Sequence, residues 1–462
     1  MREYLPLVAP RLAPPLDAGF RPAVLANHAF RAAVAPVGVP LVIGLQRQMS
    51  EFSRYETLVF PEGHPNFEWN YRYVERVVKF LLWQRGGGKM YIAGPRAIAD
   101  YLVRLYSAEG EREFDFHFMG EQVYERAFRV VACSKEDMPA ENEAGKSLGR
   151  NLAGNRIGFD LGASDRKVSA VVDGVPIYSE EVIWQPRQHA DPAYHYAEIL
   201  AGLRSAASRL PRVDAIGGSS AGIFVDNRPM VASLFRGVPP ERFGEVKDLF
   251  LRLRAQFGVP LEVINDGDVT ALAGSMSLEE NGILGIALGS SEAAGYVDMN
   301  GRITGWLNEL AFAPIDYGPS APLEEWSGDM GCGASYLSQQ CAFRLAPIAG
   351  VEVPAGLADA EQLKFIQEKL EGGHVGARRI WESMGIYLGY ALAHYADFCN
   401  IKHVLILGRC TSGLGGQLLL EGASSVLAVE FPELLATIAL HLPDEKVRRV
   451  GQSVAAASLP DL

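Results

Sequence analysis

The sequence predicts a two-lobed α/β fold preceded by an extra α/β N-terminal domain. Short apolar strands alternate with runs that carry apolar residues at helical spacing. The order of strand, small-residue turn and hairpin occurs twice, at residues 157–182 and again at residues 283–303. A length of 462 residues also exceeds one ordinary domain. Two facing copies of one unit predict two lobes with a cleft between them, an arrangement that suits a nucleotide held from both sides.

The composition narrows the class of protein. A hydrophobic fraction of 48% and a charged fraction of 21% are typical of soluble globular proteins. No uninterrupted apolar run approaches the length of a membrane-spanning helix, and the proline-broken N-terminus lacks the apolar core of a signal peptide. The net charge of -12 repels a phosphate backbone. We therefore expect a cytoplasmic protein whose partners are neither membranes nor nucleic acids.

Residues 1–150 are expected to form an accessory α/β domain of unknown role, or alternatively a degenerate copy of the unit that follows. The first forty residues are rich in Pro and Ala, and we expect them to drape over a surface rather than form a core. The Gly-Lys-Ser sequence at 145–147 lacks the first Gly of a P-loop and a preceding strand, so we assign it to a linker. The expected elements are strands at 40–46, 55–60 and 89–93 and helices at 70–83 and 95–106.

The first lobe is expected to comprise residues 151–268 together with a C-terminal helix in residues 440–462. An Asp-Gly pair at 173–174 lies between two β-rich runs, which is a strong hairpin signal. A helix at 193–210 and a strand at 213–217 that enters a Gly/Ser loop follow this hairpin. The expected strands before that helix are at 157–161, 168–172 and 175–182.

The second lobe is expected to comprise residues 269–439. A buried strand from residue 283 enters the small-residue turn at 289–291, and an Asn-Gly pair at 300–301 marks another hairpin. Two helices follow, at 357–370 and 376–400, and a strand at 403–407 enters the Gly-containing loop 408–413. This strand, turn and hairpin repeats the unit at residues 157–182, and the repetition predicts a second lobe that faces the first.

One stretch, VINDGDVTALAG at residues 263–274, is the candidate catalytic element. It follows the apolar run 261–264 and precedes a helix expected at 269–276, so it delivers Asp266 to the edge of a sheet. In phosphoryl transfer a carboxylate can accept the proton of the acceptor hydroxyl, and an adjacent side-chain amide can hold the acceptor in place. We predict that Asp266 is this base and that Asp268 caps the helix. The alternative is that Asp266 is itself a helix cap.

Three small-residue turns are candidate phosphate and nucleotide sites. FDLGAS ends a strand with Asp160, which would hold a hydrated magnesium ion, and continues with residues that let backbone amides approach a phosphate. The alternatives are a simple hairpin with a surface Asp at the first turn and ordinary Gly-rich turns at the other two. The candidate residues are Asp160, Gly162, Ser164, Gly289, Ser290, Gly408, Ser412 and Gly413.

The order of these motifs resembles the ROK family of sugar kinases, within the actin-like ATPase superfamily of ribonuclease H-like fold. The resemblance covers residues from about 155 to the C-terminus. It lies in seven short motifs that occur in the family's order: FDLGAS, SSAGIFVD, INDGD, ALGSSEAAGYV, ELAF, GDMGC and LILGRCTSG.

The resemblance implies a glucokinase-like enzyme that uses ATP and Mg²⁺ on a hexose or amino sugar and forms a homodimer. It implies that Asp266 is the base and that Asn265 and Glu309 bind sugar hydroxyls. The loop from Ser219 to Asp226 would face the sugar, with Ser220, Ala221 and Gly222 as contacts.

The departures from the family pattern are equally specific. Members hold a structural zinc ion with one His and three Cys, but this chain has Phe312, Glu325 and Ser327 at three of those positions and keeps only Cys332. One thiolate does not make the four-coordinate site that zinc prefers, so we predict no zinc. Ala334 replaces a second sugar-binding Glu. Ser291, Ala293 and Ala294 replace Gly in the second phosphate loop.

Two functions follow from these observations. The first is an ATP-dependent sugar kinase with Asp266 as general base. The second is a non-catalytic ROK-like protein that senses a sugar or nucleotide and uses the N-terminal domain as its output. The altered phosphate loop and the lost zinc ligands favour the second. A DNA-binding winged helix is not expected, because residues 1–150 carry strand signals and little basic charge.

Overall fold

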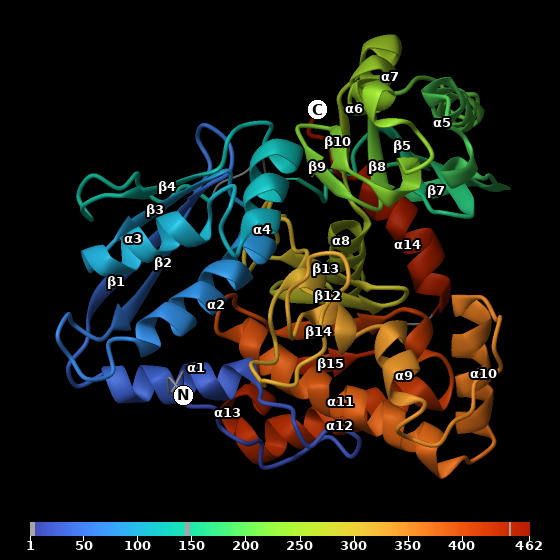
Figure 1. Cartoon of the computed structure of the whole chain (residues 1–462). Helices are drawn as coiled ribbons and strands as arrows, with labels where there is room; N and C mark the ends of the chain where they lie inside the picture. The colour runs from blue at the N-terminus through green and yellow to red at the C-terminus, as the bar shows by residue number, and fades with distance from the viewer. Residues whose placement is uncertain (1–4, 144–147, 443–444) are drawn as a thin grey trace. The chain divides into compact units, whose positions relative to one another are not determined.

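The computed structural model describes residues 5–143, 148–442 and 445–462. These residues fall into two compact units (Figure 1). Unit 1 consists of the described residues within Met1–Glu143, Ile286–Ala294 and Trp306–Leu442. Unit 2 consists of the described residues within Ala144–Gly285, Gly295–Gly305 and Pro443–Leu462. The Gly-Lys-Ser at 145–147, which we assigned to a linker, lies outside the described residues.

The N-terminal part of unit 1 contains a four-stranded sheet of order β2-β1-β3-β4. β1 pairs antiparallel with both β2 and β3, whereas β4 pairs parallel with β3. The predicted strands and helices of this region are confirmed, and β4 was not predicted. The elements are β1 (Val39–Gln46), β2 (Phe52–Val59), α2 (Trp69–Arg85), β3 (Lys89–Ala93), α3 (Arg96–Leu105), α4 (Glu113–His117) and β4 (Arg129–Ala132).

The first forty residues differ from expectation, because helix α1 (Ala23–Val34) forms there and is part of a core. Phe30 is fully buried and stacks on Tyr73 with ring centroids 3.9 Å apart. The helix occupies a proline-free, Ala-rich run, and Ala has the highest helix propensity. The prolines on either side of this run led to the wrong expectation of a draped segment.

The two units divide the chain differently from the three segments expected from the sequence. Residues 5–143 lie in one unit with residues 306–442, while residues 269–285 lie with residues 148–268. Helix α2 shows the reason for the first grouping. Its Phe80 stacks on Phe398 at 4.1 Å, and its buried Arg76 makes an ion pair with Asp329 at 3.1 Å. Apolar and charged groups of the N-terminal segment are thus buried against the later part of the chain.

The later part of unit 1 is mainly helical. Helices α11 and α12 pack closely, since a Cβ atom at Gly385 would lie 3.0 Å from the Cα atom of Gly422. The strands β14 and β15 belong to a sheet of order β13-β12-β14-β15, in which β12 (Ile283–Leu288) and β13 (Glu292–Val297) each have residues in both units. The elements are α9 (Gln339–Leu345), α10 (Asp359–Glu371), α11 (Val375–Ala396), β14 (His403–Leu407), α12 (Leu414–Glu430), α13 (Pro432–Leu435) and β15 (Ala439–His441).

Unit 2 is built on a five-stranded sheet of order β11-β8-β5-β6-β7. Strands β5, β8 and β11 are parallel, and β5, β6 and β7 are antiparallel. Helix α14 packs directly on the sheet, because a Cβ atom at Gly217 would lie only 1.6 Å from the carbonyl oxygen of Ala456. The strands are β5 (Asn155–Leu161), β6 (Asp165–Val172), β7 (Val175–Ile183), β8 (Ala215–Ser220) and β11 (Leu261–Asn265).

The helices of unit 2 complete its core. The predicted Asp-Gly hairpin between β6 and β7 is confirmed, with Asp173 and Gly174 at φ of 47° and 82° as a two-residue turn of this type requires. The remaining elements are α5 (Pro192–Ala207), β9 (Ile223–Val225), β10 (Arg228–Val231), α6 (Phe243–Lys247), α7 (Leu249–Phe257), α8 (Asp266–Leu278) and α14 (Glu445–Ala457). Within the described ranges, none of the helices has the length and apolar character needed to cross a membrane.

Candidate active site

Asp266 is the first residue of helix α8, directly after strand β11. Asn265 caps this helix, because its Oδ1 accepts a hydrogen bond of 2.7 Å from the Gly267 amide. The expectation that Asp268 caps the helix is therefore wrong. The helix begins three residues earlier than predicted, and buried Asp268 instead accepts a hydrogen bond of 3.2 Å from the Tyr296 amide.

Asp160 lies near the end of the parallel strand β5, which is separated from β11 by β8. The Ser219 hydroxyl donates a hydrogen bond of 2.7 Å to Asp160 Oδ1, and the Lys167 Nζ lies 4.0 Å from Asp160 Oδ2. Both neighbours follow from strand register, since the Cα atom of Asp160 is paired with those of Ser219 on β8 and Lys167 on β6. One oxygen of this carboxylate is held by a hydroxyl, and the other faces a cation.

The negative charge of Asp160 acts on the carboxylate of Asp266. Strands β5, β8 and β11 are adjacent and parallel, so their carboxyl ends meet at one sheet edge, with about 5 Å between neighbouring strands. Burial and the negative charge of Asp160 together raise the pKa of Asp266 to about 6. Burial also raises the pKa of Asp160, although the Ser219 hydrogen bond and Lys167 oppose this increase.

The first phosphate turn is a tight connection between β5 and β6. The Gly162 amide donates to the Asp165 carbonyl oxygen at 2.9 Å, and the exposed Ser164 donates its hydroxyl to Asp165 Oδ2 at 3.0 Å. Lys167 Nζ lies 2.9 Å from Asp165 Oδ1. Neither Lys167 nor the contact of Ser219 with Asp160 was predicted from the sequence. Pairing of Leu161 with Arg166 across the four residues 162–165 places Lys167 opposite Asp160.

The predicted sugar-facing loop begins at the end of β8. Ser220 is fully buried, and its hydroxyl oxygen has no hydrogen-bond partner among the described residues. Gly222 adopts φ of 130°, and a Cβ atom there would lie 2.5 Å from the Val231 carbonyl oxygen, so the position requires Gly. Ala221 lies between Ser220 and Gly222 in the chain, and Asn265 donates from Nδ2 to the Gly222 carbonyl oxygen at 2.8 Å. Asn265 therefore fixes this loop to the start of α8.

The other predicted nucleotide residues lie in unit 1. Gly289 donates its amide to the Ser291 carbonyl oxygen at 3.0 Å, and Ser290 is exposed. Gly408 has φ of 94°, and a Cβ atom there would lie 2.3 Å from the Leu288 carbonyl oxygen. The loop continues through exposed Ser412 to Gly413, where α12 begins.

The start of helix α12 already faces a carboxylate. Glu371 Oε1 accepts a hydrogen bond of 2.7 Å from the Leu414 amide, and a Cβ atom at Gly413 would lie 2.2 Å from the same oxygen. A negative side chain at a helix N-terminus interacts favourably with the helix dipole. One backbone amide at the start of α12 is therefore already hydrogen-bonded to the Glu371 side chain.

The predicted sugar ligand Glu309 is half-buried in unit 1 and donates its backbone amide to the Trp83 carbonyl oxygen at 3.0 Å. Ala334, at the position of the absent second Glu, is buried. The predicted site residues thus lie in both units. Asp160, Gly162, Ser164, Ser220, Ala221, Gly222, Asn265 and Asp266 belong to unit 2, and Gly289, Ser290, Glu309, Gly408, Ser412 and Gly413 belong to unit 1.

The residues at the family's zinc position do not fit a zinc site. Burial raises the pKa of the Cys332 thiol, which favours the protonated form. The neighbouring Asp329 accepts ion pairs from Arg76 at 3.1 Å, Arg112 at 2.8 Å and Lys79 at 3.8 Å. The carboxylate of Asp329, beside Cys332, is therefore already paired with cationic side chains of the N-terminal segment.

An aromatic cluster completes the same region. Phe312, which stands where the family has its His ligand, lies 4.6 Å from the Trp83 ring and 4.9 Å from the Trp326 ring. Phe114 and Phe118 each lie 5.1 Å from Trp326. Apolar packing and buried ion pairs thus connect this segment to helices α2 and α4. The described residues contain no group of three or more His, Cys, Asp or Glu side chains arranged to hold a metal.

Asp160 is suited to magnesium, which prefers other ligands than zinc does. Mg²⁺ usually keeps several waters and binds one or two protein carboxylates together with substrate phosphates. Ser219 holds only Oδ1 of Asp160, and Oδ2 has Lys167 at 4.0 Å. The second carboxylate of the same edge is Asp266. This donor set is compatible with a hydrated ion brought by a nucleotide.

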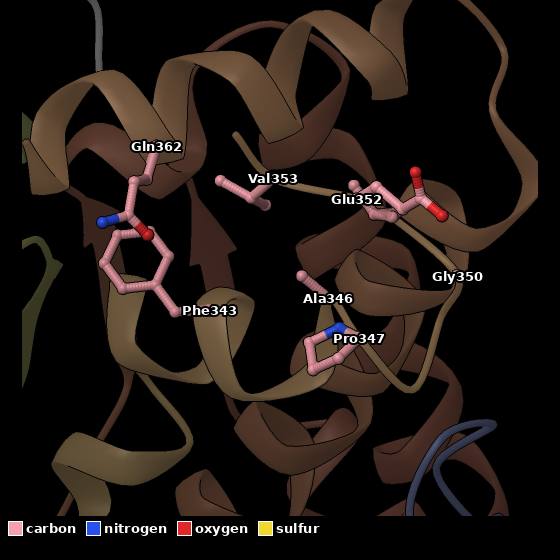
Figure 2. Close-up of a pocket in the computed structure, with 8 residues that line it drawn as sticks. Phe343, Ala346, Pro347, Gly350, Glu352, Val353 and Gln362 are labelled. Carbon is pink, nitrogen blue, oxygen red and sulfur yellow. The ribbon is translucent and has the colours of Figure 1, made fainter. Parts of the chain in front are cut away.

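A cavity of about 500 Å³ lies in unit 1, between α9 and α10 (Figure 2). Its lining is mostly apolar and includes Phe343, Val351 and Val353, together with the amide of Gln362. Figure 2 shows the carboxylate of Glu352 pointing away from Phe343. None of the predicted site residues is among the residues that line it.

No protein-family model and no curated protein matches the sequence, but solved structures do. A ROK family transcriptional regulator, described as a homologue of the E. coli Mlc protein, has a TM-score of 0.52 and 19% identity over 67% of this chain and 78% of its own. A ROK hexokinase from Thermus thermophilus has a TM-score of 0.50 and 18% identity over 65% of this chain and 97% of its own. At this identity the shared property is the fold, and the chain has the fold of these ROK family proteins over 67% of its length.

Proposed function

We propose that the chain is an ATP-dependent sugar kinase in which Asp266 is the general base. The observation that supports this most directly is that Asp160 and Asp266 stand at the carboxyl ends of the parallel strands of one sheet, where the charge of Asp160 acts on Asp266. A base is most effective when its pKa lies near the working pH. A pKa of about 6 lets the carboxylate be ionised at neutral pH and still accept a proton.

In the proposed reaction, Asp266 accepts the proton of a sugar hydroxyl as the hydroxyl oxygen bonds to the γ-phosphorus of ATP. The bond between that phosphorus and the bridging oxygen breaks, and its electron pair leaves with ADP. Asn265 holds the loop at Gly222 and would orient the sugar. Asp160 would hold Mg²⁺ through water, and the ion would neutralise phosphate charge.

The remaining predicted residues would bind the nucleotide. Amides of the turn at Gly162 and of the turn at Gly289 would approach the phosphates, with Ser164 and Ser290 as hydroxyl donors. Both hydroxyls lie on exposed residues. The loop from Gly408 to Gly413 would lie against the adenosine. A homodimer and a cytoplasmic location belong to the same proposal.

The test is ADP release with a panel of hexoses and amino sugars. Asp266→Asn keeps the side-chain shape but removes the base, so turnover should fall by about 10²- to 10⁴-fold. Asp248→Asn is the matched control, because Asp248 is an exposed carboxylate of the same unit. Equal turnover by the wild type and Asp266→Asn, or no turnover on any sugar, would contradict the proposal.

The second candidate is a non-catalytic sensor with the same fold. Such a fold hosts different functions, since both a hexokinase and a transcriptional regulator share it. The position of Glu371 at the start of α12 favours this candidate, because its carboxylate occupies the end of the loop that would otherwise hold the adenosine. Thermal-shift titration separates the two, since a ligand that binds the native state raises the melting temperature. A shift with a sugar but with no nucleotide would support the sensor.

A further inference from the structure

A cavity of about 220 Å³ in unit 1 has a strongly basic lining. Its residues are Gly88, Lys89, Arg126, Ala127 and Arg129, and we call it the basic pocket. Three of these five residues are cationic, although the whole chain has 55 acidic and 43 basic residues. A local cluster of cations in an acidic protein attracts anions and requires an explanation.

Strand register brings two of the cations together. Lys89 begins β3 and Arg129 begins β4, and their Cα atoms are paired across the parallel strands. Like charges directly opposite each other in a sheet are destabilising. Lys89 contacts the Tyr91 ring at 4.4 Å, and Arg129 is exposed. Neither forms an ion pair with an acidic side chain in the part of the chain that the structure describes.

The third cation is held in a fixed position. Arg126 Nη2 donates to the carbonyl oxygens of Gln46 at 3.0 Å and Arg47 at 2.5 Å, and its guanidinium lies 5.7 Å from the Tyr124 ring centre. The nearby acids Glu51 and Glu143 are paired with the Arg47 side chain, at 3.2 and 3.0 Å. The positive charge of Arg126 is thus positioned by neutral groups and is not cancelled by these carboxylates.

Arg126 also has an unused donor. Its Nε is buried and has no hydrogen-bond partner among the described residues. A Cβ atom at Gly88 would lie 2.5 Å from this Nε, so only Gly leaves the space beside it open. A buried donor without a partner is energetically costly. An acceptor atom of a ligand in the basic pocket would remove this cost.

We propose that the basic pocket binds a phosphate group, either inorganic phosphate or the phosphate of a small monoester such as a sugar phosphate. Guanidinium groups match phosphate oxygens in geometry and charge, and Lys adds a third positive charge. Cavities for drug-sized ligands measure about 300–1,000 Å³, so a pocket of about 220 Å³ suits a small anion better than a nucleotide. This site is distinct from Asp266 and does not depend on the proposed kinase activity.

The experiment is a thermal-shift and calorimetric titration of the full chain. The probes are sodium phosphate and glucose 6-phosphate, each against sodium chloride at equal ionic strength. Phosphate should raise the melting temperature more than chloride, because it binds the native state. Equal affinity for both probes identifies the phosphate group alone as the ligand, and tighter binding of glucose 6-phosphate identifies a monoester.

Variants assign the response to this pocket rather than to the candidate active site. Arg129→Ala should weaken phosphate binding by about tenfold, the scale of one lost charge-assisted hydrogen bond. Arg129→Glu should abolish binding and, by pairing with Lys89, raise the melting temperature without phosphate. Arg96→Ala is the control, because Arg96 is an exposed cation of α3 paired with Asp100. The proposal is overturned if phosphate and chloride act equally, or if Arg129→Glu responds like the wild type.

Discussion

Burial of Asp266 and the negative charge of Asp160 together raise the pKa of Asp266. Asp160 lies on strand β5 and Asp266 directly follows strand β11, and these two strands are separated only by β8. Ser219 of that middle strand donates its hydroxyl to Asp160. The relationship gives the candidate base a pKa of about 6 and provides the first prediction.

Removing the charge of Asp160 should lower the pKa of Asp266. In Asp160→Asn the like charge is absent while the burial of Asp266 remains, so the pKa should fall from about 6 but stay above its ordinary value. Carboxyl chemical shifts followed by NMR over pH 3–8 measure the change. Asp248→Asn should leave the Asp266 titration unchanged. An unaltered pKa in Asp160→Asn would show that burial alone causes the increase.

Asn265→Ala should destabilise unit 2 by about 1 kcal/mol, the usual cost of a lost helix cap. The variant loses the acceptor for the Gly267 amide and the donor to the Gly222 carbonyl oxygen. Urea denaturation of the purified chain measures the effect. Asn265→Ser retains a capping oxygen and should lose less stability than Asn265→Ala. Equal losses in the two variants would place the effect in the bond to Gly222 rather than in the cap.

Glu292 should make the protein less stable as the pH rises. Burial raises its pKa from 4.5 to about 8, while the hydrogen bond from Tyr395 opposes this increase. The folded state therefore holds a proton that the unfolded state releases between these values. The stabilisation is complete below pH 4.5 and is lost as the pH rises through about 8. The slope is about 1.4 kcal/mol per pH unit between the two pKa values.

Glu292→Gln removes this titration without changing the side-chain shape. The free energy of unfolding of Glu292→Gln relative to the wild type should increase from pH 5 to pH 8, as measured by urea denaturation at fixed ionic strength. Glu433→Gln is the control, because Glu433 is exposed and its variant should follow the wild type at every pH. A difference between Glu292→Gln and the wild type that stays constant with pH would contradict the prediction.

Lys79→Met should destabilise unit 1 by about 3–5 kcal/mol, as expected when one partner of a buried ion pair is removed. Lys79 Nζ lies 2.7 Å from Asp115 Oδ1 and 3.8 Å from Asp329 Oδ2, and all three side chains are buried. The variant leaves two carboxylates without this cation. Lys135→Met removes an exposed cation paired with exposed Glu56 and should change stability by less than about 1 kcal/mol. Similar losses in both variants would contradict a structural role for the buried ion pairs.

The same ion pairs predict that metal removal has no effect on stability. Arg76, Lys79 and Arg112 neutralise Asp329, so the segment around Cys332 needs no cation from solution. The melting temperature should be equal before and after treatment with a chelator, and elemental analysis of the purified chain should find no zinc in stoichiometric amount. A melting temperature that falls with chelation and recovers with zinc would refute this expectation.

The sequence by itself determined the elements whose causes are local. The Asp-Gly turn at 173–174, the apolar spacing of α2 and the strand before Asp266 each depend on neighbouring residues, and the structure confirms them. The motif order also predicted the fold that the solved ROK structures share. The start of α8 was misplaced, because Asn265, Asp266 and Asp268 are all good capping residues by type.

The tertiary structure decided what depends on distant partners. The sequence contains Lys79 and Asp329 but gives no reason to bring them together, since 250 positions separate them. Whether residues 5–143 form a separate domain depended on such buried pairs. The interaction between Asp160 and Asp266 likewise required the strand order β5-β8-β11, and the basic pocket required the register of Lys89 with Arg129. Neighbouring residues determine the helices and strands, whereas contacts between distant residues determine which charged side chains interact.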